Sequence, residues 1–104
     1  MTYVMIWYVR KNKTIDKKSM EVYADKVQEV IKSSGYDTNY SIIEPDAKFV
    51  ARNDNIHVFV GDLDNLPTKL FKKLIHLSEK DIKEIDNLAD VIIEHIKSNK
   101  KQIQ

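Results

Sequence analysis

The spacing of apolar residues changes from segment to segment along the chain, and each spacing predicts an element. Residues 3–9 (Tyr-Val-Met-Ile-Trp-Tyr-Val) are apolar throughout, which predicts a central strand covered on both faces. Between residues 20 and 31 the apolar side chains recur three and four apart, which predicts a helix with one buried face. Asp16 or Ser19 can cap the start of this helix, and Gly35 suits its end.

The middle of the chain carries the alternation that is typical of strands. From residue 36 to residue 42, larger side chains alternate with Asp, Asn and Ser, which predicts a half-buried strand that ends before Pro45. Residues 48–52 and 56–60 form two further short runs on either side of Asn53-Asp54-Asn55. Asn and Asp tolerate the backbone conformations of tight turns, so we expect a hairpin here.

The last forty residues carry helical spacing in two pieces. Asn65 can cap a first helix with Pro67 in its first turn, and its buried stripe would consist of Leu66, Leu70, Leu74 and Leu77. A second helix begins near Ser78, and its continuous apolar face comprises Ile82, Ile85, Leu88, Ala89, Ile92, Ile93 and Ile96. Residues 98–104 are polar and lysine-rich, and we expect them to fray as a C-terminal tail.

Together these elements predict an α/β fold, with α+β as the alternative class. The expected order is β-α-β-β-β-α-α, in a mixed four-stranded sheet covered by helices. A chain of 104 residues has room for one compact domain, which we place at residues 1–97.

Composition excludes several classes of protein. Seventeen Lys and Arg against 16 Asp and Glu give a net charge of +1, which is too small to hold or to imitate a polyanion. The chain has no cysteine, no signal-peptide pattern and no apolar run long enough to span a membrane, so we expect a cytoplasmic protein. Its many Lys, Ile and Asn residues, which AT-rich codons encode, suggest a low-GC host, or a phage or mobile element within one.

Two carboxylates follow an apolar run at residues 58–65 (Val-Phe-Val-Gly-Asp-Leu-Asp-Asn). Sheet proteins often hold magnesium and phosphate just after a buried strand. The string resembles the first motif of the haloacid dehalogenase-like phosphatases, and the resemblance implies a nucleophile at Asp62 and an acid/base at Asp64. In that family a glycine-threonine turn and a much longer chain with a lysine and further carboxylates follow the motif, whereas here about forty residues follow and are predicted to be helical, so Asp62 and Asp64 are candidates only. The chemistry would need the strands ending at Val9 and Val60 to be parallel neighbours, and otherwise the two residues are loop side chains beside a helix cap.

Charged side chains gather in two further places. A basic loop lies between the first strand and the first helix, where a helix N-terminus favours anions, and it contains Arg10, Lys11, Lys13, Lys17 and Lys18. The last predicted helix has an acidic face with Glu84, Asp86, Asp90 and Glu94. Such opposed patches can steer a protein partner or can simply be solvated. The three histidines have no paired spacing, so we expect no metal site.

These observations favour a small cytosolic protein-interaction module, such as a phage- or plasmid-encoded inhibitor or regulator of a host protein. No complete catalytic set is present, so we do not expect an enzyme or a cofactor. A first alternative is a magnesium-dependent protein that binds phosphoryl groups or nucleotides through the Asp-x-Asp loop. A second is a weak nucleic-acid binder that uses Lys69, Lys72, Lys73, Lys97, Lys100 and Lys101. The long apolar stripe of the last helix also leaves a homodimer open.

Overall fold

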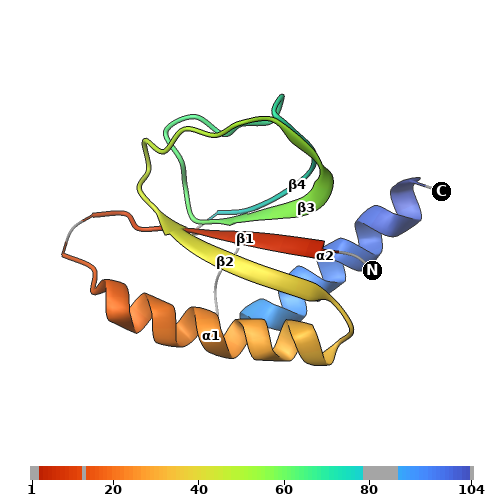
Figure 1. The fold of residues 1–104 in the computed structure, drawn as a ribbon, viewed down its shortest axis with the longest axis horizontal. Helices are drawn as coiled ribbons and strands as arrows, with labels where there is room; N and C mark the ends of the chain where they lie inside the picture. The colour runs from red at the N-terminus through yellow and green to blue at the C-terminus, as the bar shows by residue number, and fades with distance from the viewer. Residues whose placement is uncertain (1–2, 13, 79–86, 104) are drawn as a thin grey trace.

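The computed structural model describes residues 3–12, 14–78 and 87–103 of the chain (Figure 1). Four strands and two helices follow one another in the order β1 (Tyr3–Val9), α1 (Lys17–Ser33), β2 (Asp37–Ile43), β3 (Arg52–Val60), β4 (Phe71–Leu77) and α2 (Leu88–Ile103). The predicted α/β class is confirmed. The order of element types also agrees with the prediction as far as the first helix after the fourth strand.

The strands form one sheet in the spatial order β2-β1-β3-β4. All three pairings are parallel, with β1 paired to β2 from Tyr3↔Asp37 to Val9↔Ile43 and to β3 from Val4↔Ile56 to Tyr8↔Val60. The prediction of four strands with β1 in the interior is therefore confirmed, but the sheet is parallel rather than mixed. A parallel sheet needs a crossover connection after every strand.

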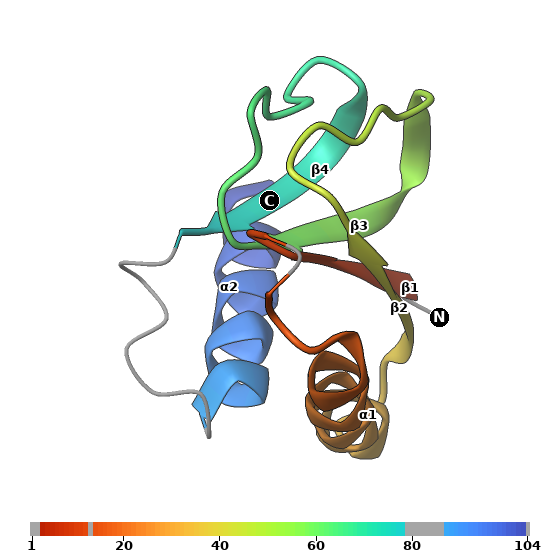
Figure 2. The same ribbon diagram turned by 90° about the vertical axis from the view of Figure 1, so that its left-hand side faces the viewer.

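The two faces of the sheet are covered in different ways. Both helices lie against one face, whereas the β2–β3 and β3–β4 connections, residues 44–51 and 61–70, arch over the other (Figures 1 and 2). The chain runs from β1 to β2 in one direction across the sheet and from β2 through β3 to β4 in the other. Right-handed crossovers running in opposite directions lie on opposite faces, so this arrangement is a doubly wound sheet in which loops replace the helices of one layer.

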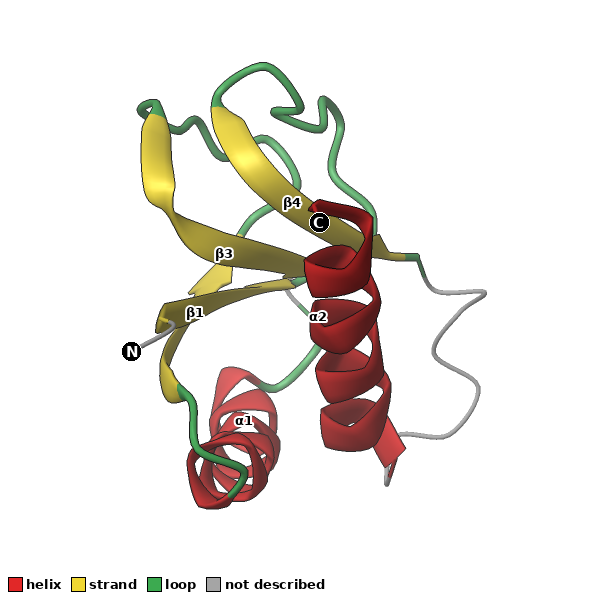
Figure 3. Ribbon diagram, turned by 90° about the vertical axis from the view of Figure 1, so that its right-hand side faces the viewer, coloured by secondary structure: helices red, strands yellow, loops and turns green. Residues whose placement is uncertain are grey.

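The main core lies between the sheet and the helices (Figure 3). Every second residue of β1 is buried there, and the core comprises Val4, Ile6, Tyr8, Ala24, Val27, Ile31, Ile56, Val58, Val60, Ile75, Leu77, Leu88, Ala89, Ile92 and Ile96. The predicted buried face of the last helix is thus confirmed from Leu88 to Ile96, while Ile82 and Ile85 lie outside the described residues. Helix α2 continues to Ile103, into the segment expected to be a tail. None of the described helices is long and apolar enough to cross a membrane.

A second cluster, which we call the aromatic layer, lies on the opposite face. Its members are Trp7, Phe49, His57, Phe59 and Phe71. Phe49 reaches it from the β2–β3 connection, with its ring centroid 5.2 Å from Trp7, 5.3 Å from Phe59 and 5.8 Å from Phe71. The aromatic layer therefore attaches one connection to the sheet in the absence of a helix.

Helix α1 begins and ends as its sequence predicts. Asp16 is the N-cap, and its carboxylate accepts a hydrogen bond from the Lys18 backbone nitrogen at 3.1 Å. After the helix, Gly35 has φ +95°, a left-handed conformation that glycine adopts without steric cost. The predicted half-buried strand is confirmed as β2, with Thr38 buried and Tyr40 and Ile42 packed against the core.

The predicted hairpin between residues 48 and 60 is wrong. Residues 52–60 form the single strand β3, which is parallel to both neighbours. All of its residues from Ile56 to Val60 are buried, so β3 is an interior strand whose hydrogen bonds go to β1 and β4. Instead of a turn, Asn53-Asp54-Asn55 coincides with a register shift against β4, as at a β-bulge.

The predicted helix over residues 66–77 is also wrong, because residues 71–77 form strand β4. The spacing of Leu70, Leu74 and Leu77 fits a helix, but pairing with β3 buries Ile75 and Leu77 in the main core. Local helical spacing is thus overridden by the tertiary context of an unfilled sheet edge. Asn65 and Pro67 lie in the β3–β4 connection instead of at a helix start.

Candidate functional site

The carboxyl ends of the strands meet at one edge of the sheet. Tyr8 pairs with Val60 in the parallel β1–β3 ladder, so the loops that follow Val9 and Val60 open on the same side. Chemistry at Asp62 and Asp64 requires this parallel pairing of the strands that end at Val9 and Val60. This edge also contains the topological switch point of the sheet, where ligands of doubly wound folds commonly bind.

Gly61 brings the ends of three strands close together at this switch point. Its φ is +105°, and a Cβ atom at this position would lie 3.1 Å from the Val9 Cβ. Its backbone nitrogen donates a hydrogen bond of 2.8 Å to the Leu77 carbonyl. A residue with a side chain would be strained by its backbone conformation and would also press on Val9, so glycine is favoured here.

Asp62 and Asp64 do not converge on a preformed metal site. Asp62 is exposed, and its Oδ1 lies 3.5 Å from the Nε2 of His76, which is 2.9 Å from the Gly61 carbonyl. Asp64 is exposed in the β3–β4 connection, and its backbone nitrogen donates to the Pro45 carbonyl at 2.9 Å. In the described part of the chain, no three His, Asp or Glu side chains are placed to hold a metal ion.

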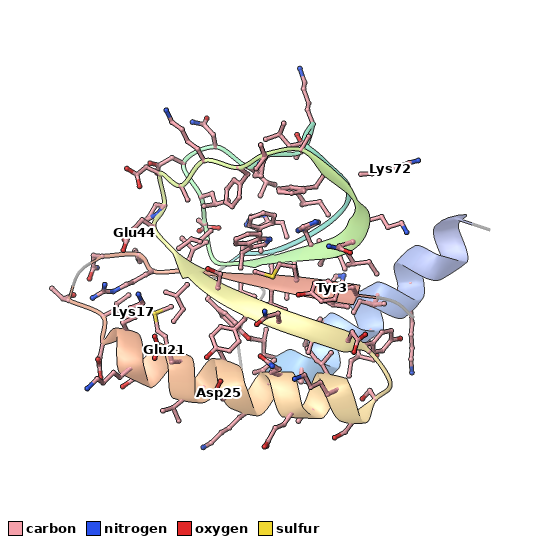
Figure 4. The ribbon with its side chains drawn as sticks, in the orientation of Figure 1. Tyr3, Lys17, Glu21, Asp25, Glu44 and Lys72 are labelled. Atoms are coloured by element: carbon pink, nitrogen blue, oxygen red, sulfur yellow. The ribbon has the colours of Figure 1, made fainter. Side chains whose placement is uncertain are left out.

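The basic loop lies at the same end of the molecule, and Figure 4 labels Lys17 and Glu44 on this side. Arg10 is held in place, because its Nε donates to the Ile15 carbonyl at 2.9 Å and its guanidinium is 3.9 Å from the Glu44 carboxylate. Lys11, Lys17 and Lys18 are exposed, and Lys13 lies outside the described residues.

The N-terminus of α1 carries a carboxylate of the chain itself. The Ser19 hydroxyl and then the Lys18 backbone nitrogen donate to Asp16, and these hydrogen bonds lower the pKa of its carboxyl group. An external phosphate at this helix end would have to displace Asp16. The site therefore does not favour the anion binding that the basic loop suggested.

Two of the four predicted acidic residues are described. Asp90 and Glu94 lie one turn apart on the exposed side of α2, whereas Glu84 and Asp86 fall outside the described residues. No described interaction joins Asp90 or Glu94 to the basic loop. Asp90 and Glu94 are thus not paired with the described part of the basic loop.

The lysines proposed for nucleic-acid binding are separate from most of the aromatic side chains that could stack on bases. Lys69, Lys72, Lys73 and Lys97 are exposed, and the side chains of Lys100 and Lys101 are not described. All described aromatic side chains except Tyr3 are instead packed in the aromatic layer or against the main core, the latter including Tyr8, Tyr23, Tyr36 and Tyr40. This placement does not favour binding of single strands by base stacking.

The two edge strands, β2 and β4, differ in how their outward backbone groups are bonded, and no pattern in the sequence indicates this difference. In a parallel strand, alternate residues direct their backbone groups to opposite neighbours. The Ile43 carbonyl accepts from the Arg10 nitrogen in the direction of β1, so the backbone of Tyr40 faces outward from β2. Its nitrogen donates to the Asn39 Oδ1 at 2.8 Å. One outward N–H at the middle of the β2 edge is therefore occupied by a side chain.

Among the described residues, no side chain covers the β4 edge in this way. The Leu77 carbonyl accepts from the Gly61 nitrogen in the direction of β3, so the backbone groups of Leu74 and His76 face outward. Within residues 3–12, 14–78 and 87–103, no hydrogen bond reaches these outward groups. An uncovered edge of this kind is a template for a further strand.

Comparison of the chain with protein-family models, with curated proteins and with solved structures finds no significant match to any of them.

Proposed function

We propose that this chain is a small protein-interaction domain that accepts an extended segment of a partner protein as an additional strand along β4. The observation that carries the proposal is the unequal treatment of the two edges. Tyr40 on β2 has its outward nitrogen covered by Asn39, whereas Leu74 and His76 on β4 present backbone groups without a described partner. Strand addition uses such groups for affinity.

The charge around β4 indicates the chemistry of the partner. Lys69, Lys72 and Lys73 are exposed at the start of this strand, and Figure 4 shows Lys72 pointing away from the sheet. Charges near an edge select partners and raise association rates. We therefore propose an acidic extended segment as the partner, which is compatible with a cytoplasmic regulator or inhibitor of a host protein.

A displayed library of random peptides, selected on the full chain, tests the proposal. We expect enrichment of acidic peptides rich in β-branched residues. In fluorescence anisotropy, these peptides should bind the Leu74→Ala variant but should bind the Leu74→Pro variant at least tenfold more weakly than the Leu74→Ala variant. Proline removes the outward N–H of residue 74 and no bond to β3, while alanine removes the same side chain and keeps the N–H. Circular dichroism shows whether both variants are folded.

Two charge-reversal variants separate this edge from the acidic face of α2. Lys72→Glu with Lys73→Glu should weaken the enriched peptides about three- to tenfold at low salt, because both charges lie beside the proposed strand. Asp90→Lys with Glu94→Lys should leave binding unchanged. Equal binding to the proline and alanine variants, or no enrichment of acidic extended peptides, would refute the β4 assignment.

The second candidate is a magnesium-dependent protein that binds phosphoryl groups through Asp62 and Asp64. The parallel β1–β3 pairing favours it, since it places both loops at one edge. A titration with Mg²⁺ and inorganic phosphate, followed by NMR, should then shift the amide signals of Asp62 and Asp64. Asp62→Asn with Asp64→Asn should abolish those shifts.

A further inference from the structure

A cavity of about 510 Å³ lies between the two connections that cover the helix-free face. This volume is within the range of small-molecule sites. Its walls are half-buried apolar side chains from both connections, namely Pro45, Ala47, Phe49, Leu66, Pro67 and Leu70. Apolar walls of this kind suit a ligand with an apolar body.

The cavity is held open by bonds on each side. The Asp64 nitrogen donates to the Pro45 carbonyl at 2.9 Å and joins the two connections. Phe49 is fixed from below by the aromatic layer, with its ring centroid 5.2 Å from that of Trp7. Two prolines also stiffen the walls. The cavity is thus formed before any ligand enters, which lowers the entropic cost of binding.

Three charged side chains are among the lining residues of the cavity. Asp46 from one connection and Asp64 from the other are exposed and line the cavity. Neither carboxylate forms an ion pair with another described residue. Lys48 is the one cation among the lining residues, so the two carboxylates leave the lining with a net negative charge. The net charge of the lining is complementary to a cationic group, and the Phe49 ring can add a cation–π contact.

We infer that this cavity binds a small organic cation, an ammonium group on an aromatic or aliphatic body, with the body between the two connections and the ammonium between Asp46 and Asp64. The inference concerns a different surface from the β4 edge and goes beyond strand addition. A strand-binding domain with this cavity would have a separate small-molecule site.

Three probes of similar size test the charge requirement. They are 2-phenylethylammonium, the neutral 2-phenylethanol and the anionic 3-phenylpropionate. Trp7 is the only tryptophan of the chain and contacts Phe49, so its fluorescence reports occupation, and amide NMR shifts locate it. We expect saturable binding of the ammonium, at least threefold tighter than that of the alcohol, and the weakest binding for the carboxylate.

Charge-neutralising variants test the named residues. Asp46→Asn and Asp64→Asn should each weaken binding of the ammonium probe about two- to fivefold and leave binding of the alcohol unchanged. Asp37→Asn removes an exposed carboxylate on β2 that does not line the cavity, and it should have no effect. Equal affinity for the three probes, no saturation, or unchanged binding in both cavity variants would overturn the inference.

Discussion

The indole nitrogen of Trp7 donates a hydrogen bond to the Nδ1 of His57, 3.1 Å away, across the β1–β3 pairing. Because Nδ1 accepts this bond, the ring proton of the neutral imidazole must lie on Nε2. His57 is completely buried, and its ring stacks on Phe71 with a centroid distance of 4.1 Å. The sole tryptophan of the chain thus fixes the tautomer of a histidine inside the aromatic layer.

Replacing Trp7 with phenylalanine should remove the donor and keep an aromatic ring in the layer. The Nδ1 of His57 would then be left without its described donor in an apolar setting, and we expect a loss of about 1–3 kcal/mol in the free energy of unfolding. Urea unfolding followed by circular dichroism measures the loss. In the unchanged protein, ¹⁵N spectra of the ring should show a protonated Nε2 and an unprotonated Nδ1. A protonated Nδ1 would contradict this assignment.

Substitution of the two glycines with positive φ should separate backbone strain from crowding. Gly35→Ala places a Cβ in open space at φ +95°, and we expect it to cost about 1–2 kcal/mol for the left-handed conformation. Gly61→Ala has a similar φ of +105° but also places its Cβ 3.1 Å from the Val9 Cβ, and crowding adds about 1–3 kcal/mol. Thermal unfolding of both variants checks the order, and equal losses would show that Val9 moves freely.

Because Asp16 caps α1, the free energy of unfolding should decrease at low pH. Hydrogen bonds from Ser19 and Lys18 lower the pKa of Asp16 in the folded chain, so its stabilising effect is present above the ordinary aspartate pKa. It is lost as the pH falls below about 4 towards the lower, folded value. In Asp16→Asn the cap hydrogen bond persists without a titratable group, so this contribution to the acid dependence should disappear. Asp16→Ala should lower the melting temperature at neutral pH as well.

Tyr8 should be the tyrosine that resists alkaline ionisation. Burial, followed by the proximity of Tyr23 and Tyr40, raises its pKa far above the ordinary value. An absorbance titration should therefore leave Tyr8 protonated until the protein unfolds. A raised folded pKa means that stability falls as the pH rises above about 10, where the unfolded chain ionises first.

Tyr8→Phe is the matched variant for that titration. The Tyr8 hydroxyl is buried and has no hydrogen-bond partner among the described residues, so its removal should leave stability at neutral pH within about 1 kcal/mol or raise it. The part of the alkaline slope that Tyr8 causes should vanish. A large loss of stability at neutral pH would indicate that the hydroxyl has an essential partner.

Elements with one dominant local signal could be predicted from the sequence. The apolar run of β1, the three-and-four spacing of α1 with its Asp16 cap, and the alternation of β2 each match the structure. In residues 48–77 two signals compete. The turn-forming residues before Ile56 and the helical spacing around Leu74 are overridden because β3 and β4 complete the sheet.

The candidate sites were less predictable, because they depend on which segments become neighbours. Chemistry at Asp62 and Asp64 requires the strands that end at Val9 and Val60 to be parallel neighbours, but no pattern in the sequence shows whether these strands pair. Asn39 is an ordinary polar residue of an alternating strand until the pairing shows that Tyr40 faces outward. The cavity between Pro45 and Leu70 arises only because two connections cross the same face.

The position of β1 between β2 and β3 also suggests how the chain assembles. β1, α1 and β2 are consecutive and can form a first folded unit, whereas β3 must be added on the far side of β1 and β4 must wait for β3. Parallel pairings join residues distant in sequence, and such contacts form slowly. If β4 is added last, the edge proposed to receive a partner is also where we expect amide hydrogens of the sheet to exchange readily.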